Sequence, residues 1–241
     1  MAIGSARTAE EFGRAFPGVT VLSSGGPKVR ATIPPKPAVV VATPGAEPVV
    51  AGGYGAALLL DGSAMLARPD LRAAEETLRR WMAAAALVRP AGDGGRVIIG
   101  ADGSLPTVQA MVRWDPGGHA TRELSARREL QFPPWVAMAS IEGDAAGVLA
   151  ALDVLAVPPD GELLGPVELE ESGQPEYQEK FRQFEPSTAT ADREPRLRAL
   201  VRTPLAHRKA LCAALQAVSA SRSARKEPGA VRIRVDPSDL F

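Results

Sequence analysis

The sequence has little of what a catalytic centre usually needs. Its 241 residues include one cysteine, Cys212, and two histidines, His119 and His207. A single cysteine excludes an internal disulfide and a cysteine-based zinc site, and it predicts a reduced, cytoplasmic setting. Neither histidine lies in an HxH or HExxH spacing, so we expect no metal site. Cys212 falls in the apolar stripe of a predicted helix, where we expect a small buried side chain.

Long hydrophobic runs and net charge are missing as well. No stretch of about 20 apolar residues is present, and the first residues lack the apolar segment of a signal peptide, so we predict neither a membrane span nor a leader. Lys and Arg total 28, as do Asp and Glu. This balance excludes a surface that is basic throughout, but it allows a local basic face. The phosphate-binding spacing GxxxxGK[ST] does not occur either.

The first half of the chain alternates predicted strands and helices. Short continuous apolar runs predict strands buried on both faces at 36–45, 56–62 and 95–101. Amphipathic patterns predict helices at 8–16, 69–88 and 105–114, the first with Thr8 as its N-cap. Strands that alternate with helices indicate a parallel α/β sheet, which we assign to residues 1–116.

The second half has a different organisation. Residues 117–134 are predicted to form a polar helix and a joint at Pro133-Pro134, because proline lacks an N–H and disfavours a helix before it. Residues 135–241 follow a β-α-β-β-α-β order, which is typical of a ferredoxin-like α+β domain. The polar stretch 171–195 within it is predicted to be a mobile insertion.

The neutral total hides a strong segregation of charge. Between Arg193 and Arg234 there are eleven Lys or Arg residues and two acids, whereas 162–192 contains eight acids and two bases. Arg232 and Arg234 share one side of a strict period-two strand, which is the pattern expected for contact with a phosphate backbone. The alternative is a solvated sheet face partly neutralised by the acidic segment. These strands carry no aromatic residues, so base stacking is not predicted.

Several of these stretches carry a family resemblance. The segments ELSARRELQFPPWVAMASIEG, LLGPVELEE, RALVRTPLAHRKAL and VRIRVDPSDL resemble the C-terminal part of the PriA family of primosomal replication-restart proteins, also called primosomal protein N′. The segments VVVATPGAEP, ALLLDG and PDLRAAEETLRRW resemble the family's second, RecA-like helicase lobe, in the divergent form seen in high-GC bacteria. The resemblance implies recognition of branched DNA, a role in reloading the replicative helicase and a ribosomal-S10-like, ferredoxin-like domain that contacts DNA.

The sequence departs from the family pattern in three places. An active second lobe would carry Q-x-x-G-R-A-G-R after its long helix, where this chain has AAAALVRP with Arg89 as its one arginine. The family's ATP and zinc sites lie in upstream segments that this sequence does not contain, so the resemblance implies no cofactor for this chain. The stretch after the Gly-Pro pair, arginine-rich in many relatives, is acidic here. We therefore predict neither ATP hydrolysis nor unwinding.

Together these observations predict a silent helicase-lobe remnant joined to a DNA-contact domain that acts in replication restart. The predicted phosphate contacts are Arg127, Arg128, Arg196, Arg198, Arg202, Arg232 and Arg234. One alternative is an interaction scaffold that binds primosome proteins or single-stranded-DNA-binding protein with little DNA affinity. Another is an ATPase that takes its Walker loop from a separate chain and uses Arg89 as its arginine finger.

Overall fold

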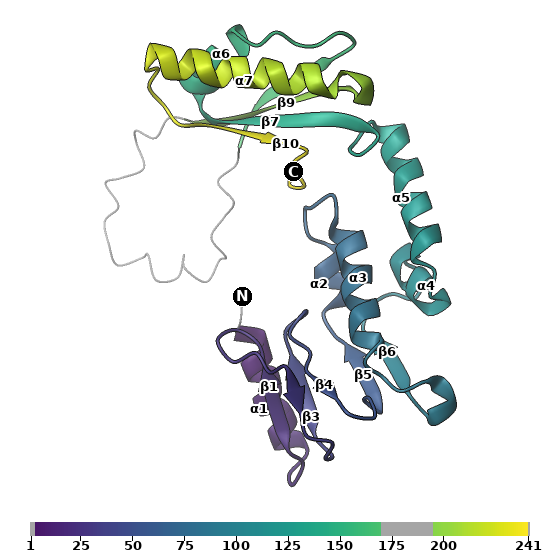
Figure 1. Cartoon of the computed structure of the whole chain (residues 1–241). Coiled ribbons are helices and arrows are strands. Elements are labelled where there is room, and N and C mark those ends of the chain that lie inside the picture. The colour runs from purple at the N-terminus through teal and green to yellow at the C-terminus, as the bar shows by residue number, and fades with distance from the viewer. Residues whose placement is uncertain (1–2, 170–194, 241) are drawn as a thin grey trace, which may run out of the picture. The chain divides into compact units, whose positions relative to one another are not determined.

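The computed structural model describes residues 3–169 and 195–240 (Figure 1). The chain divides into two compact units, Met1–Thr121 and Arg122–Phe241, and the division falls within helix α5 (Pro116–Leu130). Almost all of the predicted insertion at 171–195 lies outside the described residues.

The first unit contains short parallel strands and five α-helices that include the start of α5. Its elements before α5 are α1 (Ile3–Ala15), β1 (Val21–Ser24), β2 (Thr32–Ile33), β3 (Val39–Ala42), β4 (Val49–Val50), β5 (Ala56–Leu59), α2 (Gly62–Leu66), α3 (Ala73–Ala85), η1 (Ala91–Asp93), β6 (Arg96–Ile99) and α4 (Pro106–Arg113). The pairs β1–β3, β2–β4 and β5–β6 are all parallel, as the sequence predicts. Among the described strands, however, they form three separate two-stranded sheets and not one continuous sheet.

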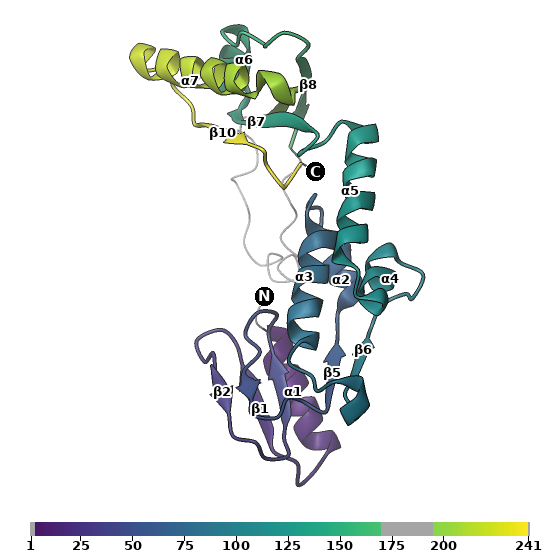
Figure 2. The ribbon, with the colours of Figure 1, turned by 45° about the vertical axis from the view of Figure 1, so that its right-hand side comes forward.

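The strands of this unit are less buried than their apolar sequences predict. Leu59 of β5 is 8% exposed and packs with Leu78 and Trp81 of α3 in the unit's core. Strands β5 and β6 lie side by side (Figure 2). Their paired residues Leu58 and Ile98 are 51% and 57% exposed. The prediction of burial on both faces is therefore wrong, since an apolar run alone does not reveal whether a second layer covers the other face.

One predicted helix start is also wrong. Helix α1 begins at Ile3, so Thr8 lies in its interior and is not its N-cap. The residues before Thr8 include Ala6 and Arg7, which are good helix formers, and they extend the helix past the capping pattern.

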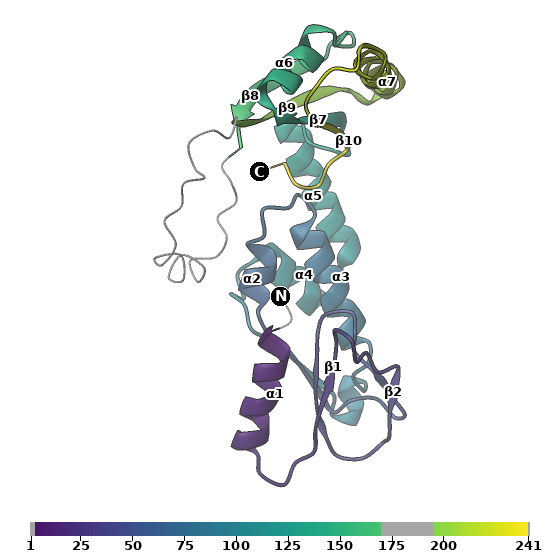
Figure 3. The same ribbon diagram turned by 90° about the vertical axis from the view of Figure 1, so that its left-hand side faces the viewer.

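The second unit is built on one antiparallel sheet. Its elements after α5 are β7 (Val136–Asp144), α6 (Ala145–Asp153), β8 (Glu162–Glu168), β9 (Arg196–Pro204), η3 (Leu205–His207), α7 (Arg208–Arg225) and β10 (Val231–Val235). The strand order is β10-β7-β9-β8, so the first and last strands of the unit are neighbours. Helices α6 and α7 lie on the same side of this sheet (Figure 3).

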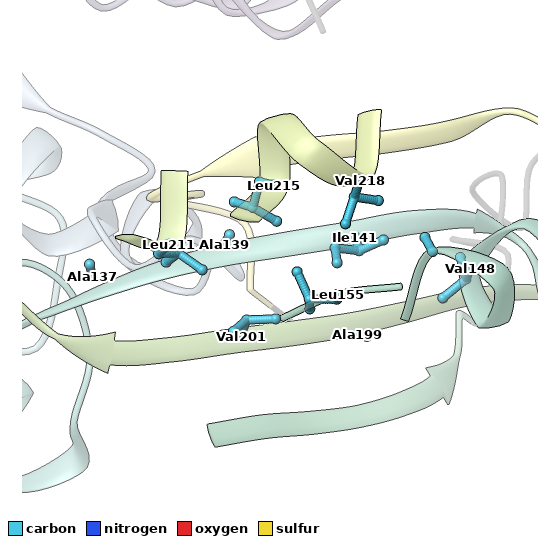
Figure 4. Close-up of a cluster of buried hydrophobic side chains, with 11 residues drawn as sticks. Ala137, Ala139, Ile141, Val148, Leu155, Ala199, Val201, Leu211, Leu215 and Val218 are labelled. Carbon is cyan, nitrogen blue, oxygen red and sulfur yellow. The ribbon is translucent and has the colours of Figure 1, made fainter. Parts of the chain in front are cut away.

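The core of this unit lies between the sheet and the two helices (Figure 4). Alternation along β7 directs Ala137, Ala139 and Ile141 into it, and all three are fully buried. Helix α7 contributes Leu211, Leu215 and Val218 to the core. Cys212 is only partly buried, in contrast to its prediction, because adjacent helical residues are turned about 100° from each other and Leu211 takes the inward position.

The chain leaves α5 where the prolines predict. The helix ends at Leu130, Gln131 has a positive φ of 57°, and Trp135 N donates to Phe132 O at 3.0 Å. β7 then begins at Val136. A tight turn of five residues thus connects the polar helix to the sheet that carries most of the candidate arginines.

Candidate nucleic-acid interface

The face of the four-stranded sheet that points away from α6 and α7 is called here the outer face. Side chains alternate along a strand, so the neighbours of the core residues on β9 and β10 point outward. The outer face therefore receives five of the seven candidate arginines: Arg196, Arg198 and Arg202 from β9, and Arg232 and Arg234 from β10. Arg232 and Arg234 thus share one face as the sequence predicts, and Arg196, Arg198 and Arg202 join them there from β9.

A buried carboxylate occupies the middle of this face. Glu142 of β7 lies between the two basic strands, directly opposite Arg198 on one side and Arg232 on the other. Its Oε1 atom accepts from Arg198 Nε at 2.9 Å and from Arg234 Nη2 at 2.7 Å. The Glu142 hydrogen bond is the main reason why the pKa of Arg234 is raised above its ordinary value. Arg198 and Arg234 are thus fixed in position, and one of their two charges is neutralised by Glu142.

Arg202 is held in a comparable way at the opposite end of the face. Its Nε and Nη2 atoms both donate to Glu162 Oε2 on β8, at 2.8 and 2.6 Å. Glu162 is exposed, so this pair remains accessible to water and contributes little to stability. An anion could compete with Glu162 for Arg202 more easily than with Glu142 for its partners.

Arg196 and Arg232 are the least restrained members of the set. Both side chains are exposed, and neither forms an ion pair within the part of the chain that the structure describes. Both lie near the end of β7, opposite Asp144 and Glu142 respectively. Asp144 uses its carboxylate to cap α6, accepting from Gly147 N at 2.6 Å. This end of the outer face therefore presents two solvated guanidinium groups.

The two remaining candidates, on α5, differ sharply from each other. Arg127 is 7% exposed; its Nη1 donates to Pro133 O at 3.3 Å, and its Nη2 lies 3.7 Å from Glu123. Arg128 is exposed, and its guanidinium carbon lies 4.6 Å from the centre of the Trp135 ring. A buried guanidinium that donates to the turn after its own helix is positioned to stabilise that turn, whereas Arg128 is accessible to a ligand.

Two acidic residues of this face escaped the sequence reasoning. Glu142 shares the strand parity of Met138 and Ser140, but its central place follows from the β10-β7-β9 register, which periodicity does not predict. Asp239, which follows β10, accepts from Arg234 Nη1 at 2.5 Å. A period-two pattern reveals which residues share a face but not which strands are neighbours.

Other ligand sites are sparse in the described residues. No group of three or more His, Cys, Asp or Glu side chains at 3–169 and 195–240 could hold a metal ion. A mostly apolar surface cavity of about 350 Å³ lies beside Leu78, Met82 and the buried His119 in the first unit. Arg89, the candidate arginine finger, is exposed. Its guanidinium packs close to Gly55, where an added Cβ atom would lie 2.9 Å from Nη2. Where the chain is described, none of its helices is both long and apolar enough for a membrane crossing.

Comparison with known proteins identifies the second unit. Residues 128–238 match the family model described as "Primosomal protein N C-terminal domain". Over 242 residues the chain is 47% identical to the "Probable replication restart protein PriA" of Mycobacterium tuberculosis, an alignment that covers 98% of this chain and 35% of that protein. The protein of the same name from Mycobacterium leprae is 46% identical over 235 residues, with 98% and 34% covered. The chain belongs to the PriA family.

The family match places the outer face within a PriA domain. Six of the seven candidate arginines lie inside the matched range 128–238, and Arg127 lies one residue before it. The PriA resemblance that the sequence suggests is thus confirmed, and it extends over nearly the whole chain. The chain spans about a third of the length of the PriA relatives it matches.

Proposed function

We propose that this chain acts in replication restart by binding forked or branched DNA through the outer face of its second unit. The observation that supports the proposal best is the gathering of Arg196, Arg198, Arg202, Arg232 and Arg234 on the sheet face opposite α6 and α7. Guanidinium groups bind phosphate oxygens in a bidentate manner, and such contacts position a protein without reading base sequence. The preferred ligand is therefore a DNA structure and not a base sequence.

Within this proposal the arginines have different roles. Arg196 and Arg232 are exposed and unpaired in the described chain, so they make the first phosphate contacts. Arg198 and Arg234 are preorganised by Glu142, and Arg202 exchanges Glu162 for a phosphate oxygen. Arg128 extends the contact at the α5–β7 turn, and Arg127 acts by holding that turn. No base-reading contact is needed.

The proposed fold follows from the same elements. The order β-α-β-β-α-β and the sheet order β10-β7-β9-β8 support a ferredoxin-like fold, which we assign to the second unit. We assign a divergent RecA-like helicase lobe to the first unit on the basis of its parallel strand pairs and its alternation of strands with helices. We keep the predicted limits of 1–116, 117–134 and 135–241 as part of this proposal.

The proposal assigns no catalytic activity to the chain by itself. The sequence has no GxxxxGK[ST] loop, and only Arg89 could act as an arginine finger. ATP and zinc are accordingly assigned to other parts of the longer relatives. Replicative helicase reloading, a cytoplasmic setting and contacts with other primosome proteins belong to the same proposal, and the relatives' names support its role in replication restart.

Binding of a forked duplex across a salt series tests the DNA contact. The slope of log K against log salt becomes shallower by about 0.9 for each phosphate contact that is lost. We therefore expect the slope of the variant Arg196→Ala/Arg232→Ala to be shallower than that of the wild type by close to two units. Lys209→Ala, a charge removed from α7 on the opposite layer, is the control and should leave the slope nearly unchanged. A wild-type slope near zero, or equal slopes for all three proteins, would contradict the proposal.

A second function is favoured by the surface at the α5–β7 turn. Trp135 is 41% exposed and Leu130 is 61% exposed, beside the cation of Arg128. Tryptophan and arginine are enriched among the residues that dominate protein–protein binding energy. The chain would then be a primosome scaffold for partners such as single-stranded-DNA-binding protein. A pull-down with purified partner proteins tests this function. Capture that persists in excess DNA and is abolished by Trp135→Ala would favour it.

A further inference from the structure

The residues that follow β10 turn back across the outer face. We call Asp236–Leu240 the return segment. Asp236 has a φ of 47°, its N–H donates to Met138 O at 2.7 Å, and its Oδ1 accepts from Met138 N at 3.2 Å. Its Oδ2 accepts from Arg208 Nη2 at 2.7 Å. This clamp ends the β10–β7 ladder and redirects the chain to the side of the sheet opposite α7 (Figures 1 and 3).

One residue of the return segment forms an ion pair there, and another is buried. Asp239 Oδ2 accepts from Arg234 Nη1, and Leu240 is only 4% exposed. Burial tends to raise the pKa of Asp239, but the hydrogen bond from Arg234 and the charges of Arg234 and Arg198 outweigh it and lower the pKa. Met138 and Ser140 also point to the outer face, and both are fully buried. The middle of the outer face is therefore covered and not open to solvent.

The two acids on Arg234 differ in how easily they can leave. Glu142 belongs to the central strand β7 and its side chain is 6% exposed, so it stays in place unless the sheet opens. The Asp239 side chain is 47% exposed and belongs to an irregular segment outside the sheet. An incoming anion can therefore replace Asp239 on Arg234, whereas it cannot replace Glu142.

We propose that the return segment is an autoinhibitory latch, in which Asp239 occupies the position on Arg234 that a DNA phosphate takes in the complex. This inference rests on the proposed DNA contact of the outer face. Leu240 anchors the closed latch by burying its side chain, and Asp236 is the fixed hinge from which the segment opens. Opening exposes Arg234 and removes a negative charge beside Arg198. The latch thus makes the covered part of the face available only to a ligand with enough phosphate groups to displace it.

The test is binding of a forked DNA duplex by the full chain and two latch variants. Asp239→Asn removes the competing charge and Leu240→Ala weakens the anchor. We expect both variants to bind about five-fold more tightly or better, a change in the ordinary range for coupled sites, and Asp239→Asn to steepen the salt slope by about 0.9. Asp153→Asn, the same charge change at the end of α6, is the control and should produce a much smaller gain. In an Arg234→Ala background the gain from Asp239→Asn should vanish.

The outcomes separate the latch from the DNA contact itself. If the wild-type chain binds the fork and Asp239→Asn gains no more than Asp153→Asn, the latch is wrong and the proposed function stands. If neither the wild-type chain nor any latch variant binds the fork, the proposed function fails and the latch fails with it. If the latch variants bind the fork and the wild-type chain does not, both the DNA contact and the latch are supported, and the wild-type latch is closed too firmly for the fork to open it.

Discussion

Arg234 and Glu142 are 92 residues apart in the sequence, and their side chains meet at 2.7 Å on the outer face of the sheet. Arg198 donates to the same Glu142 oxygen, so one buried carboxylate fixes two cations from two different strands. A buried charge that loses its partner is costly, although these arginines retain some exposure to water that reduces the cost. The triad is therefore both the charge centre of the face and a tie between β10, β7 and β9.

The first prediction concerns this triad. Glu142→Gln should lower the free energy of unfolding by about 1–3 kcal/mol, because Arg198 loses its charged partner and Arg234 keeps only its more exposed pair with Asp239. Glu162→Gln is the matched control: its exposed pair with Arg202 should be worth about 0–1 kcal/mol. Urea unfolding of the two variants measures the difference. Equal losses would show that the buried carboxylate has no special structural role.

The second prediction separates the adjacent arginines of α5. Arg127→Ala should lower the free energy of unfolding by about 1–3 kcal/mol, because the buried guanidinium donates to Pro133 O in the turn before β7. Arg128→Ala removes an exposed group and should change stability by about 0.5 kcal/mol or less, while it weakens fork binding. Thermal unfolding together with fork binding tests the pair. If Arg127→Ala leaves stability unchanged but weakens DNA binding, Arg127 is a direct DNA contact and not a support of the turn.

The third prediction concerns the core in Figure 4. Leu211 is fully buried between α7 and the sheet, so Leu211→Ala should lower the free energy of unfolding of the second unit by about 2–5 kcal/mol. Leu205→Ala provides the comparison, because Leu205 is 52% exposed at the start of the same helical region. Chemical denaturation followed by circular dichroism gives both values. Similar losses at the two positions would contradict the assignment of Leu211 to the core.

The fourth prediction is a pH dependence in the first unit. The hydrogen bonds from Arg79 and then Arg80 hold the pKa of Glu76 at about 2, below its ordinary value. A depressed pKa stabilises the folded state above the unfolded value near 4.5, and this contribution is lost as pH falls toward 2. The difference in unfolding free energy between the wild-type chain and Glu76→Gln should therefore shrink from pH 5 to pH 2. A difference that stays constant over this range would show that the ion pairs do not stabilise the fold.

Sequence reasoning succeeded where one periodic pattern decides the structure. The alternation of VRIRV placed Arg232 and Arg234 on one face, with Val231 and Ile233 against the core. It failed where the answer depends on elements distant in the sequence. The exposure of Leu58 and Ile98 depends on which layers cover the β5–β6 pair, and the position of Glu142 depends on strand order. Neither property is encoded within a window of a few residues.

The pairing of β7 with β10 also determines when the sheet can form during synthesis. β7 is the first strand of its unit to leave the ribosome and β10 is the last, yet the two lie side by side in the finished sheet. Until residues 231–235 are synthesised, the backbone groups of one edge of β7 have no strand to bond with, and such an edge is prone to pair with other chains. Closure of the sheet, and with it assembly of the Glu142 triad, therefore has to wait until β10 has been synthesised, and it depends on contacts between distant residues, which form slowly.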